Sequence, residues 1–86
     1  MKRGEFISVA RRMVKEYINY HVMKGGKYIT LKQVDIIGFN NVDGNLKCIL
    51  YTRETPEDIY KVTYNKEEDK VNSEIIKKDG FRNFRR

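Results

Sequence analysis

Few side chains in this chain are of the types that perform covalent chemistry, and their arrangement is not catalytic. The chain has one histidine, His21, one cysteine, Cys48, and two serines. A Cys–His nucleophile needs an exposed thiol with a lowered pKa and a third group that orients the imidazole. Cys48 lies in an expected strand with its side chain toward the core, which is typical of a small buried hydrophobic residue. We therefore expect no catalytic residues and no enzyme activity.

The spacings that hold metals and phosphates are also absent from the sequence. No cluster of His, Cys, Asp and Glu has metal-ligand spacing. The run Gly25-Gly26-Lys27 follows an expected helix, so it suits a helix cap and not a phosphate loop. Glu67-Glu68-Asp69 is expected to be a solvated hairpin loop. We therefore expect neither a metal nor a cofactor.

The C-terminal end, KKDGFRNFRR, interleaves basic and aromatic side chains. Basic side chains pair with phosphates, and aromatic rings offer stacking faces for unpaired bases. We expect residues 79–86 to form a basic aromatic tail that binds nucleic acid with a strong salt dependence. Two alternatives are that the phenylalanines pack back onto the domain, or that the tail is simply disordered. The candidate residues are Lys77, Lys78, Phe81, Arg82, Phe84, Arg85 and Arg86.

A second basic cluster lies near the N-terminus. Residues 1–32 hold eight basic side chains against two acidic ones, whereas residues 33–74 hold five against nine. If one face of the first helix is buried, the basic side chains of the other face share one exposed ridge. The ridge and the tail form a single patch only if they lie on the same side of the molecule. The expected ridge residues are Lys2, Arg3, Arg11, Arg12 and Lys15.

Length and composition indicate the size and class of the domain that carries these residues. The chain has 86 residues, of which 40% are hydrophobic, so we expect one small α+β domain over residues 1–78. No apolar run is long enough to span a membrane, and the start MKRGEF is not a signal peptide. A lone cysteine fits a reducing cytoplasm. A net charge of +6 also suits a small soluble protein that carries charge only for solubility.

Residues 4–24 are predicted to form the single long helix. Apolar residues recur there at steps of three and four, and Gly25-Gly26 can take the left-handed conformation that ends a helix. The predicted buried stripe consists of Phe6, Val9, Ala10, Met13, Tyr17, Tyr20 and His21, widened by Ile7, Val14, Ile18 and Val22.

Asp43-Gly44 predicts a tight type I′ hairpin between two strands, because both central residues of that turn need a positive φ. This turn fixes the register and therefore the two faces of the hairpin. The face expected to point into the core holds Ile37, Phe39, Cys48 and Leu50. The opposite face then holds Val34, Ile36, Ile49 and Tyr51, which we expect to form a partner interface because a chain this short has no second layer to cover them.

A second hairpin is predicted over residues 59–76. Pairing Asn65 with Lys70 places apolar residues on one face and polar residues on the other, including Lys61 opposite Glu74. The sum is one helix packed on a four-stranded antiparallel meander. This α-β-β-β-β order resembles the cystatin-like arrangement and its larger NTF2-like relatives over about residues 4–78. The cystatin inhibitor hairpin carries a Gln that Asn40-Asn41-Val42-Asp43-Gly44 lacks, and the chain has no Trp, so the resemblance concerns topology alone.

Two functions agree with these patterns. The first is a small non-catalytic binding protein that contacts nucleic acid through the basic helix and tail. The second is a protein–protein interaction or homodimerisation module, such as an adaptor or inhibitor, that uses the outer face of the hairpin over residues 34–53. Small size without catalytic residues is also typical of accessory proteins of phages and mobile elements.

Overall fold

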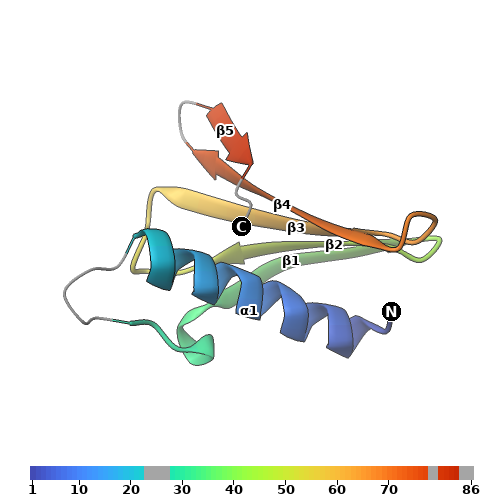
Figure 1. Cartoon of the computed structure of the whole chain (residues 1–86), viewed down its shortest axis with the longest axis horizontal. Coiled ribbons are helices and arrows are strands. Elements are labelled where there is room, and N and C mark those ends of the chain that lie inside the picture. Colours follow the sequence, from blue (N-terminus) through green and yellow to red (C-terminus); the bar gives the residue numbers. More distant parts are fainter. Residues whose placement is uncertain (23–27, 78–79, 84–86) are drawn as a thin grey trace.

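One helix and one antiparallel sheet form the two layers of the protein (Figure 1). The computed structural model describes residues 1–22, 28–77 and 80–83. The strands follow one another across the sheet in the order β1-β2-β3-β4-β5. The elements are α1 (Arg3–His21), the 3₁₀ turn η1 (Leu31–Gln33), β1 (Asp35–Val42), β2 (Asn45–Tyr51), β3 (Asp58–Asn65), β4 (Lys70–Lys77) and β5 (Gly80–Asn83).

The predicted helix and four-strand meander are confirmed, and β5 extends the sheet beyond them. Residues 80–83, which the sequence pattern assigned to a tail, pair with the second half of β4, with Phe81 opposite Ile76 and Lys77 opposite Gly80. The sheet therefore has two edge strands, β1 and β5, which lie at its opposite sides.

The buried stripe of α1 is narrower than predicted. Phe6, Ala10, Val14 and Ile18 recur every fourth residue and are fully buried against the sheet. The prediction that Tyr20 and His21 belong to this stripe is wrong, because Tyr20 lies two residues, or about 200° of rotation, beyond Ile18 and is 75% exposed. The helix begins where the Glu5 carboxylate accepts a hydrogen bond of 3.3 Å from the backbone N–H of Lys2. The predicted Gly25-Gly26 cap lies outside the described residues.

Both hairpins have the predicted turns and pairings near their tips. Asp43 and Gly44 have φ values of 54° and 87°, as a type I′ turn requires. The second hairpin keeps the predicted register along its length, and Lys61 and Glu74 form a salt bridge of 2.8 Å across it. The two tips are tied together by a hydrogen bond of 2.8 Å from the Lys66 backbone N–H to the Asn45 side chain.

A β-bulge in β1 changes which residues of that strand face the core. Gly38 pairs with Ile49 as predicted, but Ile36 pairs with Leu50, so Ile37 is left as an extra residue without a partner across the ladder. The predicted pairing of Ile37 with Leu50 is therefore wrong. Ile37 is 55% exposed, whereas Ile36 packs against the core.

The core lies between α1 and the inner face of the sheet. Tyr60 fills much of its centre, with its ring 6.2 Å from that of Tyr17, and its hydroxyl lies 2.8 Å from the Thr55 hydroxyl. This packing is what fixes α1 across β2 and β3. The other buried core residues are Phe6, Ala10, Val14, Ile18, Ile29, Val34, Leu46, Cys48, Leu50, Val62, Tyr64 and Ile75.

Candidate functional surfaces

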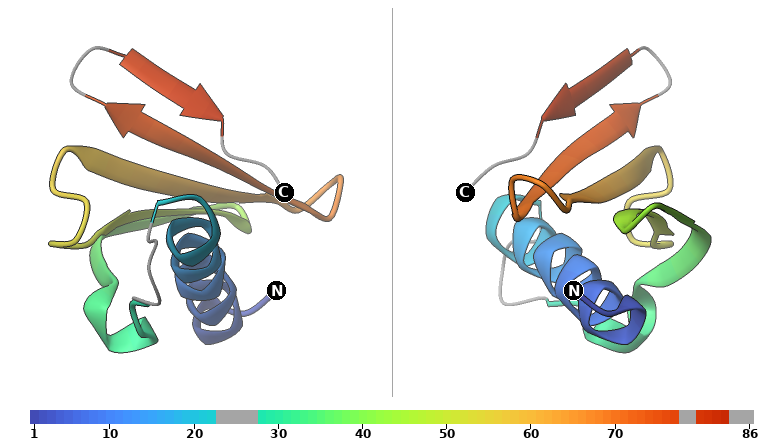
Figure 2. Two further views of the ribbon diagram at one scale, coloured as in Figure 1. Left: turned by 60° about the vertical axis from the view of Figure 1, so that its left-hand side comes forward. Right: turned by 90° about the vertical axis from the view of Figure 1, so that its right-hand side faces the viewer.

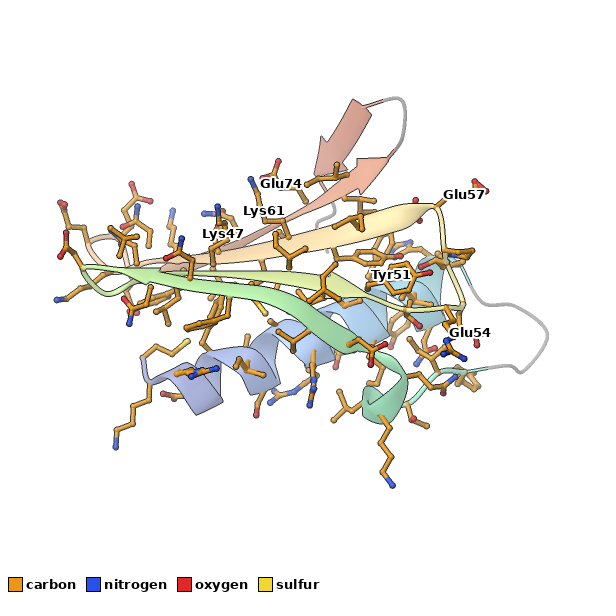
Figure 3. All side chains as sticks on the ribbon, turned by 180° about the vertical axis from the view of Figure 1, so that it is seen from behind. Lys47, Tyr51, Glu54, Glu57, Lys61 and Glu74 are labelled. Carbon is orange, nitrogen blue, oxygen red and sulfur yellow. The ribbon has the colours of Figure 1, made fainter. Side chains whose placement is uncertain are left out.

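Two surfaces face away from the core and carry the candidate residues. The helix lies on one side of the sheet, and its outward side forms the first surface (Figure 2). The opposite side of the sheet forms the second, and within the described residues no other element covers it (Figure 3). We call this second surface the outer face; it is formed by the outward-pointing residues of the strands.

Two basic side chains of α1, Arg3 and Arg11, lie close to β1 and β2. The Arg3 guanidinium lies 4.8 Å from the centre of the Phe39 ring in β1, which is a cation–π contact. Arg11, about two turns later, is close enough to Cys48 for its charge to oppose the rise in the pKa of that thiol. Phe39 and Cys48 are paired neighbours on β1 and β2. Arg3 and Arg11 therefore flank the same part of the sheet.

Lys15 follows Arg11 by one turn, and Arg12 lies beside it on the solvent side of α1. Arg12 is exposed, whereas Arg11 and Lys15 are half-buried. The expectation of a fully exposed ridge is therefore wrong for Arg11, whose Nε is buried and has no hydrogen-bond partner among the described residues. We call Arg3, Arg11, Arg12 and Lys15 the basic row; Lys2, which is also exposed, precedes it.

The basic row carries little compensating charge. In residues 1–22, 28–77 and 80–83, the salt bridge that forms is Lys61–Glu74, on the sheet, so no cation of the row is neutralised by an ion pair there. Glu5 and Glu16 are the acidic residues of the helix, against five basic ones from Lys2 to Lys15. Glu16 lies one turn after Arg12, where its negative charge makes the electrostatic potential less positive. The row as a whole is a positive strip on a rigid element.

The described part of the predicted basic tail, residues 80–83, is not brought to this strip. Phe81 and Arg82 lie in β5, opposite Ile76 and Ile75 of β4. β5 is the edge strand farthest from β1, and it is well separated from α1 in both views of Figure 2. Lys78, Phe84, Arg85 and Arg86 lie outside the described residues, and Lys77 ends β4. The strand β5 and the basic row thus lie at opposite sides of the fold.

Two exposed tyrosines lie near the C-terminal end of α1. Tyr20 is 75% exposed and Tyr28 is 70% exposed. The Asn19 side chain ties Ile29, the residue after Tyr28, to α1, because it accepts a hydrogen bond of 2.8 Å from the Ile29 N–H and donates one of 3.2 Å to the Ile29 carbonyl. Sequence analysis placed Tyr20 in the core and did not single out Tyr28. The missed signal for Tyr20 was its offset from the four-residue repeat.

The four residues predicted to form a partner interface lie partly on the outer face and partly in the core. Ile49 and Tyr51 are half-buried on the outer face, as the register predicts. Val34 is 1% exposed and belongs to the core, and Ile36 packs against the core, because Val34 precedes the strand and the bulge shifts the alternation of β1. Ile59 and Ile76 pair across β3 and β4. They take the place of Val34 and Ile36 in the apolar surface of the outer face.

Two of the groups able to react, the Cys48 thiol and the Tyr60 hydroxyl, are buried. Cys48 is fully buried, as predicted, and burial raises the pKa of its thiol. Burial likewise raises the pKa of Tyr60 to about 12. In the described part of the chain, no group of three or more His, Cys, Asp and Glu is placed to hold a metal ion. None of the helices described there has the length and apolar character that crossing a membrane requires.

No protein-family model, curated protein or solved structure matches this chain. The cystatin-like label therefore stays a topological prediction.

Proposed function

We propose that this protein is a non-catalytic binding protein that contacts the phosphate backbone of nucleic acid through the basic row of α1. The observation that carries the proposal is the clustering of Arg3, Arg11, Arg12 and Lys15 on one helix without an ion-pair partner among the described residues. The setting we propose is the reducing cytoplasm, where the buried Cys48 remains a thiol.

The length of the basic row suits several consecutive phosphates. Arg3 and Lys15 are twelve residues apart, which is about 18 Å along a helix. A rigid helix holds these cations at fixed spacing, so binding costs less side-chain ordering than it would on a flexible segment. Because phosphates are alike at every nucleotide, such contacts give affinity without sequence preference.

Single strands are the favoured form. Tyr20 and Tyr28 present exposed rings, and base stacking on such rings requires unpaired bases. The cations of residues 77–86 add a second, separate contact in this proposal, because β5 lies at the other side of the sheet.

The test is the salt dependence of binding to a labelled single-stranded oligothymidylate, with a duplex of equal length for comparison. Four phosphate contacts predict a slope of about −3 for the logarithm of the association constant against the logarithm of salt concentration. The affinity should then fall about fifty-fold between about 50 and 200 mM salt. Arg12→Ala combined with Lys15→Ala should bring the slope to about −1.4.

The matched control is Lys66→Ala combined with Lys70→Ala, which removes the same charge from exposed positions at a hairpin tip. This control should weaken binding only slightly and leave the slope near its original value. If no binding is seen at low salt, or if both double variants change the slope equally, the basic row is not a binding surface. If only a variant of Arg82, Arg85 and Arg86 lowers the slope, the contact belongs to the C-terminal residues.

A further inference from the structure

The outer face carries an apolar band that the monomer leaves uncovered. Ile49 and Tyr51 in β2, Ile59 in β3 and Ile76 in β4 point away from α1, and Ile76 is 37% exposed. The four side chains lie on neighbouring strands, so they form one continuous band. An uncovered apolar band on a sheet indicates a contact with another surface.

Opposite charges flank this band along the strand direction. Lys47 lies two residues before Ile49 on β2, and Glu57 lies in the turn before β3, two residues ahead of Ile59. Because β2 and β3 are antiparallel, these two residues lie at opposite ends of the band, with Tyr51 between them (Figure 3). Arg53 and Glu54 share the loop with Glu57, so that loop carries one more acidic than basic residue.

The flanking charges are placed symmetrically. Leu50 pairs with Tyr60, and this pair marks the middle of the band. Lys47 precedes Leu50 by three residues, which places it about 10 Å from the middle at the usual rise of a strand. Glu57 precedes Tyr60 by three residues, and because it lies in the turn just before β3 its distance from the middle is at most about the same. A two-fold rotation about an axis in the interface, perpendicular to the strands, exchanges the two ends. It brings Lys47 of each copy across the interface from Glu57 of the other, with a sideways offset of about one strand spacing.

We propose that the outer face binds the outer face of a second copy of this chain about that two-fold axis. The two apolar bands stack in the centre, and two Lys47–Glu57 pairs close the ends. The occupant is a second copy because the surface is complementary to itself after the rotation, which an interface between identical chains requires.

The size of the outer face suits a dimer of modest affinity. Five strands about 4.8 Å apart and about seven residues long cover roughly 550 Å² in each copy. Two such faces bury about 1,100 Å², which is just above the size needed for a specific interface. The net charge of +6 per chain opposes the association weakly, since the basic rows would lie on the two outer layers, about 30 Å apart and beyond the Debye length.

The decisive experiment is sedimentation velocity of the intact chain from low micromolar to several hundred micromolar concentration. The wild type should shift from monomer to dimer across this range. Ile49→Lys should remain a monomer while keeping the circular dichroism spectrum and melting behaviour of a folded domain. The matched control is Leu31→Lys, which makes the same kind of change at an exposed position in η1, beside the helix. It should dimerise like the wild type.

Variants that reverse the charges of Lys47 and Glu57 then test the two-fold arrangement. Lys47→Glu and Glu57→Lys should each weaken dimerisation at least three-fold, because like charges then meet at both ends. The double variant carrying both changes should regain the wild-type dimerisation constant, since it reverses the polarity of the face without changing its complementarity. A wild-type chain that stays monomeric overturns the proposal, whatever it does with nucleic acid. Single charge variants that dimerise like the wild type overturn the two-fold arrangement.

Discussion

The two faces of the sheet are formed by the same strands, but burial within the monomer accounts for the side chains of the inner face only. Along β2 and β3 every inner position is buried, and none of them between Leu46 and Tyr64 is charged except Asp58 at the start of β3. On the outer face, Lys47, Lys61 and Thr63 alternate in space with Ile49 and Ile59. Burial under α1 explains the inner face completely. It does not explain the isoleucines of the outer face, which the dimer proposed above would cover.

The largest expected contrast comes from adjacent residues of β3. Tyr60→Ala should lower the free energy of unfolding by about 3–5 kcal/mol, because it opens a large cavity beneath α1, whereas Ile59→Ala on the outer face should cost about 1 kcal/mol or less. Urea unfolding at low micromolar concentration, where the proposed dimer would be dissociated, measures both. Equal costs would mean that both faces are packed within the monomer, and the outer face would then need no partner.

A smaller effect of burial on the inner face should appear in the stability of the protein at alkaline pH. Burial raises the pKa of Tyr60 from 10.0 to about 12, so the folded state holds the phenol proton more tightly than the unfolded state. This stabilisation is fully present below pH 10 and is lost as the pH rises toward 12; two pKa units correspond to about 2–3 kcal/mol. Tyr60→Phe lacks the ionising group. The stability difference between wild type and Tyr60→Phe should therefore shift in favour of the variant above pH 10, and parallel pH profiles would contradict the burial of this hydroxyl.

Much of the inner face could be predicted from the sequence, because local chemistry specifies it. Asp43-Gly44 fixes one turn, and the alternation of β3 and β4 allows one register that keeps their apolar residues together. The same register also places Ile59 opposite Ile76, so these two residues of the outer face were within reach of sequence reasoning. The prediction of a polar outer side for that hairpin rests on the pairs Lys61–Glu74 and Thr63–Asn72 and does not include the two isoleucines.

Other features depend on contacts that a sequence pattern does not contain. The apolar residues of α1 span most of its circumference, so only the packed sheet decides that Phe6, Ala10, Val14 and Ile18 are buried while Tyr20 is exposed. The half-burial of Arg11 follows from the same choice of face. The pairing of β5 with β4 is different, because it is local in sequence: Lys77 pairs with Gly80, but the basic residues around β5 made the pattern typical of a charged tail.

The bulge in β1 predicts the third and smallest difference in unfolding free energy between a variant on the inner face and a variant on the outer face. Because Ile37 is the extra residue, Ile36 takes the inner position beside Leu50 and the alternation is restored from Gly38 onward. Ile36→Lys should therefore cost about 2 kcal/mol, since it places a charge against the core, whereas Ile37→Lys should change the free energy of unfolding by less than about 0.5 kcal/mol.

The same two variants distinguish a β1 strand with the bulge from a regular β1 strand. In a regular ladder Ile37 would lie opposite Leu50 and point inward, so Ile37→Lys would be the costly change and Ile36→Lys the harmless one. Urea unfolding of the two variants at low concentration decides between these orders. If Ile36→Lys is the costlier variant, one inserted residue is what moves Val34 and Ile36 from the outer face to the core, and the outer band is left to Ile49, Tyr51, Ile59 and Ile76.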